Sequence, residues 1–170
     1  MNQQFLRRAI PALAIIIILL VLFALPRISS PLESSVRYGT CSRLCASDPM
    51  KALTLAHEWR AARPDLPAAR HCEALALFAI HDYPHAADAF VALAKETAPL
   101  KPLLASQLYA QGAKTYQLAK QYEAAMNAAS SAQALDPRNP ETKALLDNIA
   151  KEKSQSSPGT LAQPNHTDHK

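Results

Sequence analysis

The stretch Ser106–Asn139, SQLYAQGAKTYQLAKQYEAAMNAASSAQALDPRN, decides the fold of this chain. Its tyrosines and alanines recur at helical spacing and are followed by a proline, at Tyr109, Ala113, Tyr116, Tyr122, Ala125, Ala132 and Pro137. Ala113 and Ala125 are small, and two antiparallel helices approach closely only where the facing side chains are small. Pro137 lacks the backbone N–H that would extend a second helix, so the chain turns there. The stretch therefore predicts a pair of antiparallel helices.

The same pattern recurs earlier in the chain. Ala52, Ala86 and Ala125 hold equivalent positions, at intervals of 34 and 39 residues, and the longer interval reflects five additional residues around Thr97–Lys101. A period of 34 with small residues at fixed phases indicates stacked helix–turn–helix units, each buried against the next. Such a stack presents a long surface to a partner and rarely forms a catalytic cleft.

Ser106–Asn139, with its closing LDPRNP, resembles a tetratricopeptide (TPR) repeat. Pro67–Leu100 resembles the family through Ala74, Leu77, Tyr83, Ala86, Phe90 and Leu93, although Arg70 and Glu73 stand where the family usually has apolar residues. Upstream, Asp48–Pro64 fits a second helix, whereas Glu33–Ala46 makes a poor first helix. The resemblance covers roughly Tyr38–Lys153. It implies an all-α fold: a short right-handed solenoid of antiparallel helix pairs with a C-terminal capping helix.

The chain divides by composition into five segments. These are a short N-terminal tail (1–8), an apolar segment (9–26), a linker rich in Ser and Pro (27–37), the helical domain (38–153) and a polar tail expected to be disordered (154–170). Helices are expected over 40–46, 50–62, 67–80, 84–95, 103–118, 122–134 and 140–152. Prolines at four of these helix starts support the boundaries, because a missing N–H costs little there.

The apolar segment predicts one transmembrane helix. It holds 18 uncharged residues, AIPALAIIIILLVLFALP, between Arg8 and Arg27, which is just long enough to span a bilayer. A cleaved signal peptide would make the domain a secreted protein. That alternative is disfavoured because the apolar core is long and Leu22 is too bulky two places before Ala24. Arg7 and Arg8 favour a cytoplasmic N-terminus. The sequence thus predicts a single-pass protein of the inner (cytoplasmic) membrane, with its domain facing the periplasm or exterior.

Charge and motifs argue against two classes of function. The chain holds 18 Lys and Arg against 14 Asp and Glu, interspersed along it, and no basic stripe predicts nucleic-acid binding. No nucleophile elbow, glycine-rich phosphate loop or convincing carboxylate pair points to an enzyme. His81 and His85 are separated by a turn, so they do not share a helical face. We expect no catalytic residue, no cofactor and no metal site.

Three cysteines leave several pairings open. Cys41 and Cys45 lie on one helical face, so a disulfide between these two is the least favoured. A disulfide from Cys45 or Cys41 to Cys72 would join neighbouring repeats, with Cys45 slightly preferred because Cys41 is nearer a helix end. Reduced, buried cysteines are the alternative, above all in a cytoplasmic domain.

The resemblance also implies a peptide-binding groove lined by the first helix of each pair. Its positions correspond to His71, Leu75, Phe78, Gln107, Gln111, Lys114 and Gln117. TPR domains that bind a C-terminal carboxylate use Lys, Arg and Asn at such sites, and here only Lys114 is basic. Phe78, the one large aromatic of the set, is the expected centre of binding. In the competing interpretation Leu75 and Phe78 are ordinary packing residues.

Two functions fit these predictions. The first is a membrane-tethered TPR adaptor or scaffold that binds a protein or peptide partner in the cell envelope. The second is a structural spacer or accessory subunit whose anchor recruits the complex. For the repeat itself, Ala125 is predicted to lie at the closest helix approach, and Ala128, outside the motif, to tolerate a larger polar residue.

Overall fold

The computed structural model describes residues 31–156. It divides into two compact units, Met1–Gly39 and Thr40–Lys170, whose described parts are 31–39 and 40–156. The predicted anchor (9–26) and residues 157–170 of the predicted tail lie outside the described residues. Among the described helices, none is long and apolar enough to cross a membrane.

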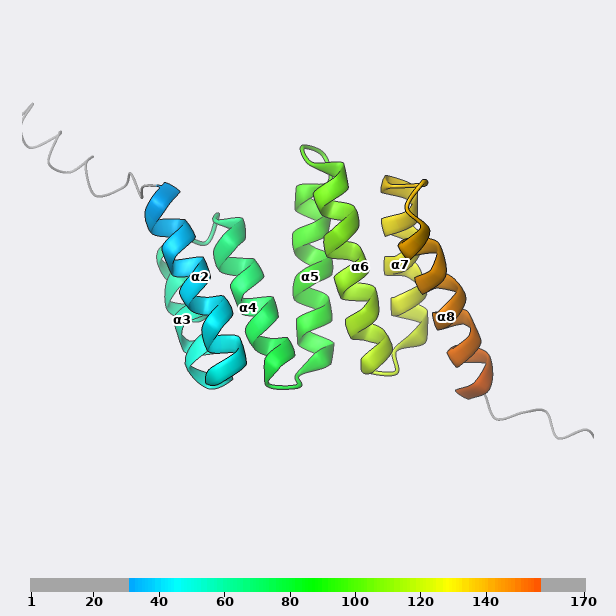
Figure 1. The fold of residues 1–170 in the computed structure, drawn as a ribbon, viewed down its shortest axis with the longest axis horizontal. Helices are drawn as coiled ribbons and strands as arrows, with labels where there is room; N and C mark the ends of the chain where they lie inside the picture. Colours follow the sequence, from blue (N-terminus) through cyan, green and yellow to red (C-terminus); the bar gives the residue numbers. More distant parts are fainter. Residues whose placement is uncertain (1–30, 157–170) are drawn as a thin grey trace, which may run out of the picture. The chain divides into compact units, whose positions relative to one another are not determined.

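The described part of the chain consists of seven helices (Figure 1). They are α2 (Pro31–Ser47), α3 (Pro49–Ala62), α4 (Pro67–Ala79), α5 (Tyr83–Thr97), α6 (Pro102–Leu118), α7 (Tyr122–Leu135) and α8 (Pro140–Ser156). From α3 onward each helix packs against the next, and α8 also reaches α6. The predicted all-α stack of helix pairs is confirmed.

Two boundaries differ from the prediction. Residues 31–37 were expected in a linker, but they form the first turns of α2. Pro31 is compatible with a helix start, Glu33 in the first turn favours the helix dipole, and the Ser35 hydroxyl bonds back to the Leu32 carbonyl at 2.8 Å. Residues 154–156, expected in the disordered tail, complete α8. Ser and Pro therefore mark a helix start at residue 31 and not only a linker.

Prolines begin α3, α4, α5 and α8 as the sequence predicts, and Pro102, expected in the connection before it, also begins α6. A proline occupies the first or second position of α3, α4, α5 and α6, where its missing N–H costs no helical hydrogen bond. Asp48 caps α3 as well, since its Oδ1 accepts from the backbone N–H of Lys51 at 3.2 Å.

The core joins α4 to α8. Ala113 and Ala125 are fully buried in an apolar cluster with Phe90, Leu108 and Ile149. A Cβ added at Gly112 would lie 2.7 Å from Cγ2 of Val91, so α6 packs closely against α5 at a position where it has no side chain.

The expected tolerance of Ala128 is wrong. Ala128 is 4% exposed and belongs to the same apolar cluster as Leu145 and Ile149 of α8. The repeat motif assigns α7 one buried face, directed at its partner helix. The structure buries Ala128 as well, in a cluster to which α8 contributes, and a larger polar side chain there would have to displace packed neighbours.

Candidate functional site

A cleft between α6 and the start of α8 is the candidate binding site. Its volume is about 180 Å³. Residues of α6 line one wall, and residues of the α7–α8 turn and α8 line the other: Ser106, Gln107, Ala110, Gln111, Lys114, Asn139, Glu141, Thr142 and Leu145. Three of the groove residues predicted from the family resemblance, Gln107, Gln111 and Lys114, therefore come together in one hollow.

The cleft offers two charges and several amides. Lys114 and Glu141 are exposed, and neither side chain has an ion pair within the described residues. The side chains of Gln107, Gln111 and Asn139 carry both donors and acceptors. Ala110 and the buried Leu145 supply apolar surface. This combination can bind a peptide backbone through amides and one charged side chain through Lys114 or Glu141.

Buried hydroxyls fix the walls of the cleft. The Ser106 hydroxyl donates to the backbone carbonyl of Ala132 at 2.9 Å, which ties α6 to α7. The Thr142 hydroxyl lies 2.6 Å from Oε1 of Gln133 and 2.9 Å from the carbonyl of Asn139. Because these bonds are shielded from solvent, they hold the cleft in one geometry before any partner arrives.

His71 connects the cleft to α4. Its Nε2 donates to Oε1 of Gln111 at 3.2 Å, and its ring meets Phe90 edge-on with centroids 5.6 Å apart. Burial lowers the pKa of His71, although the hydrogen bond to Gln111 opposes that shift. The imidazole is therefore neutral near pH 7 and acts as a hydrogen-bonding contact between two repeats.

The other predicted groove residues lie apart from the cleft lining. Leu75 is half-buried against the apolar cluster, as the packing interpretation expected. Phe78 is 39% exposed near the end of α4, and its ring packs edge-on against Tyr83 with centroids 5.5 Å apart. Gln117 is half-buried in the last turn of α6. Phe78 is thus neither core nor part of the cleft lining.

Six lining residues were not among the predicted groove positions: Ser106 and Ala110 of α6, and Asn139, Glu141, Thr142 and Leu145 on the other wall. From the sequence, α8 is expected only to cap the stack. One local signal was available, because Asn139 precedes Pro140 and its Oδ1 accepts from the backbone N–H of Glu141 at 2.9 Å, as a helix cap does. That signal predicts the start of α8, but it does not predict that α8 faces α6.

The disulfide joins Cys41 to Cys72, with Cα atoms 6.0 Å apart. The slight preference for Cys45 was wrong. It assumed that Cys41 is close to a helix end, whereas α2 begins ten residues earlier and Cys41 is fully buried. Cys45 is a half-buried free thiol, and burial raises its pKa.

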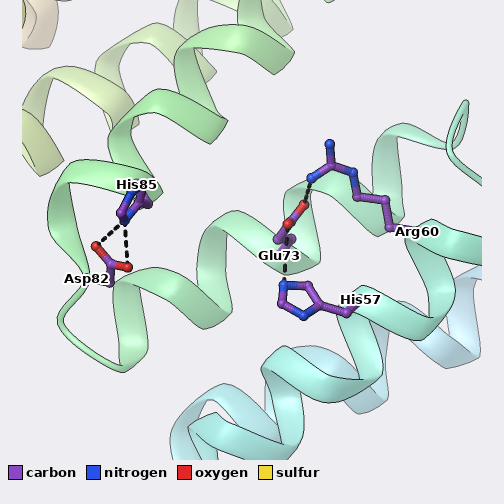
Figure 2. Close-up of polar contacts among 5 residues, drawn as sticks. All are labelled: His57, Arg60, Glu73, Asp82 and His85. Atoms are coloured by element: carbon purple, nitrogen blue, oxygen red, sulfur yellow. Dashed lines mark hydrogen bonds and ion pairs between the residues drawn. The ribbon is translucent and has the colours of Figure 1, made fainter.

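Charged side chains occupy the contact of α3 with α4 (Figure 2). The Glu73 carboxylate, only 12% exposed, bonds to Arg60 and lies 3.5 Å from Nε2 of His57. Next to it, Arg70 of α4 pairs with Glu96 of α5. Arg70 and Glu73, which stand where the family usually has apolar residues, are thus each paired with an opposite charge on a neighbouring helix.

The histidines near the α4–α5 turn are separate, as the spacing predicts. His85 Nδ1 lies 2.8 Å from the Asp82 carboxylate (Figure 2), while His81 Nδ1 lies 2.6 Å from the Tyr83 hydroxyl. Over residues 31–156 no three His, Cys, Asp or Glu side chains are grouped so that they could hold a metal ion.

Comparison with known proteins identifies the architecture. No protein-family model matches the chain, and no curated protein matches it. A solved structure does: the NMR structure of the first TPR domain of the human RPAP3 protein superposes with a TM-score of 0.59 at 16% sequence identity, covering 74% of this chain and 96% of that one. At this identity the likeness concerns the fold alone. The chain therefore has a TPR-like fold.

Proposed function

We propose that this protein is a membrane-tethered TPR-like adaptor that binds an extended segment of a partner protein in the α6–α8 cleft. The observation that carries the proposal is the cleft itself, in which Lys114 and Glu141 stand without ionic partners beside a row of amides. Stacked helix pairs are typical of non-catalytic binding scaffolds, because each unit contacts its neighbours and leaves long faces open.

The cleft suits a polar segment better than an apolar one. A volume of about 180 Å³ accommodates one or two side chains. Gln107, Gln111 and Asn139 can bond to the N–H and C=O groups of a backbone that passes over them. Lys114 would fix the register through an acidic side chain of the partner. Because Lys114 is the one basic residue of the lining, recognition of a terminal carboxylate by several cations is not part of the proposal.

The tether is the second part of the proposal. It rests on the 18 uncharged residues between Arg8 and Arg27, which we propose span the inner membrane and leave the helical domain in the periplasm or exterior. Mass spectrometry of the membrane-extracted protein should find residues that precede Ala24. A mature N-terminus near residues 26–31 would refute the anchor and favour a secreted protein.

Partner recovery tests the binding site. The full chain carrying Lys114→Ala, crosslinked in membranes and purified, should recover about tenfold less partner than the unmodified chain, because one charge-assisted hydrogen bond is lost. Lys143→Ala removes an exposed lysine of α8 that does not line the cleft, and it should leave recovery unchanged. Equal recovery with both variants would contradict binding in this cleft.

The alternative, a spacer whose anchor recruits the partner, makes the opposite prediction. An unrelated spanning helix in place of residues 9–26 would abolish recovery in that case. Retained recovery, still sensitive to Lys114→Ala, would support the cleft.

A further inference from the structure

The first helix pair, defined here as Thr40–Ser47 of α2 together with α3, has few large side chains that are fully buried. The apolar cluster that contains Phe90, Leu108 and Ile149 runs from α4 to α8, and none of its described members comes from α2 or α3. The buried residues of α3 are Ala52, Ala56 and Trp59. Two alanines bury little apolar area, so Trp59 is the one large side chain of α3 that is fully buried, while Leu53 and Leu55 are half-buried.

Charges at the same contact add little stability. Glu73 of α4 bonds to Arg60 and approaches His57, both on α3 (Figure 2). The side chains of Arg60 and His57 are 49% and 58% exposed, so solvent screens these pairs. Glu73 loses most of its own hydration at this contact, which offsets much of the attraction.

The disulfide is the strong link at this end of the stack. Cys41 of α2 and Cys72 of α4 are both fully buried, and the bond closes a loop across 31 positions that contains all of α3. A crosslink over a loop of this length removes much of the freedom of the open chain. In a repeat stack, a terminal pair that contacts one neighbour only is the first element to open.

We propose that Cys41–Cys72 is an oxidation-dependent latch that completes the TPR-like stack by holding the first helix pair on α4. The thiolate of one cysteine attacks a disulfide oxidant and releases one of its thiolates. The thiolate of the other cysteine then attacks the mixed disulfide and releases the second, so the protein loses two electrons and two protons to the oxidant. Once formed, the bond is shielded because both cysteines are buried.

Cys45 does not compete for this bond. It lies one turn after Cys41, and burial raises the pKa of its thiol, so at neutral pH it is protonated and a poor nucleophile. Reducing conditions thus leave the first pair able to open while α4–α8 keep their own core. Oxidation, as in an extracytoplasmic compartment, locks the pair in place.

The latch also affects the surface beside α4, which is separate from the α6–α8 cleft. The disulfide holds α2 beside α4, the helix that carries His71, Leu75 and Phe78. The α6–α8 cleft is formed by later repeats and does not require the bond. Opening of the first pair therefore changes the surface beside α4 and spares the cleft.

Trp59 reports the latch directly, because it is the single tryptophan of the chain and only 3% exposed. The full chain is compared with Cys41→Ala/Cys72→Ala and, as a matched control, with Cys45→Ala. In the double variant we expect red-shifted tryptophan emission. We also expect amide exchange over residues 40–62 to be about 100-fold faster or more, as follows from loss of a loop closure of this length. Exchange over residues 102–149 should not change, and Cys45→Ala should match the unmodified chain.

Three results with the double variant would contradict the latch. The first is unshifted tryptophan emission with unchanged amide exchange. The second is amide exchange that is equally fast over residues 40–62 and 102–149, and the third is failure of the variant to fold. The same exchange measurement on the reduced unmodified chain serves as a second test, and slow exchange over 40–62 there would also contradict it. None of these measurements involves a partner. The latch can therefore be refuted while the proposed binding in the cleft is supported, and the binding can be refuted while the latch is supported.

Discussion

His81 and Lys120 occupy equivalent positions in successive turns, 39 residues apart, and both have left-handed backbones with φ of 65° and 60°. Each follows the last residues of a first helix. The N–H of Asp82 donates to the Leu77 carbonyl at 3.0 Å, and the N–H of Gln121 donates to the Tyr116 carbonyl at 2.9 Å. These bonds form the same C-terminal cap twice. The repeat is therefore preserved in backbone geometry where the sequence differs entirely.

Lys120→Gly should stabilise the domain. A non-glycine residue at positive φ costs about 1 kcal/mol or more, and glycine removes that cost. Urea unfolding at constant m-value should show a gain of roughly 0.5–1 kcal/mol. Lys120→Ala is the control, because alanine keeps the strain. A loss of stability with glycine would show that Lys120 contributes through a contact that its φ does not reveal.

Gly112→Ala should destabilise the domain by about 1 kcal/mol, because overpacking outweighs the better helix propensity of alanine. The new Cβ meets Cγ2 of Val91 at 2.7 Å, and valine in a helix has almost one rotamer with which to respond. In a Val91→Ala background the same change should become neutral or stabilising. Thermal melts of the four proteins measure this coupling, and additive effects would contradict a close contact of α5 with α6 at Gly112.

Tyr116 should make stability depend on alkaline pH. Burial raises the pKa of Tyr116, and the hydrogen bond that its hydroxyl donates to Asp88 raises it further. The folded pKa exceeds the unfolded value of about 10. The neutral tyrosine therefore contributes its full stability below pH 10, and this contribution is lost as the pH rises above that value. Unfolding free energies measured from pH 8 to 11 should fall more steeply for the unmodified chain than for Tyr116→Phe. Parallel curves would contradict the shift.

Local chemistry predicted most of the fold. Prolines at helix starts and alanines at fixed phases indicated the six helices α3–α8 to within a few residues, because both signals act over one or two turns. Three features depended on distant contacts instead. Ala128 is buried in a cluster that spans several helices, Cys41 lies well inside α2 and pairs with Cys72 of α4, and Glu73 is tolerated because Arg60 faces it from α3.

Only residues on one wall of the candidate site were predicted from the sequence. The groove positions of the TPR pattern correctly selected Gln107, Gln111 and Lys114, which line one wall of the cleft. The other wall could not be predicted. α8 does not repeat elsewhere in the chain, so comparison between repeats cannot show which of its faces packs against the stack. Its position follows from the burial of Leu145 and Ile149 and from the hydroxyl of Thr142. Those contacts turn Asn139 and Glu141 toward α6.

Site-specific photocrosslinking in membranes tests the central claim, binding in the α6–α8 cleft, most directly. A photoreactive phenylalanine analogue is placed in the full chain at Gln111, which lines the cleft, or at Ala144, which is exposed on α8 and does not. The account predicts a discrete crosslinked product from position 111 that is lost when Lys114→Ala is added, and no such product from position 144. The same product from both positions, or a product from position 111 that is indifferent to Lys114→Ala, would contradict it.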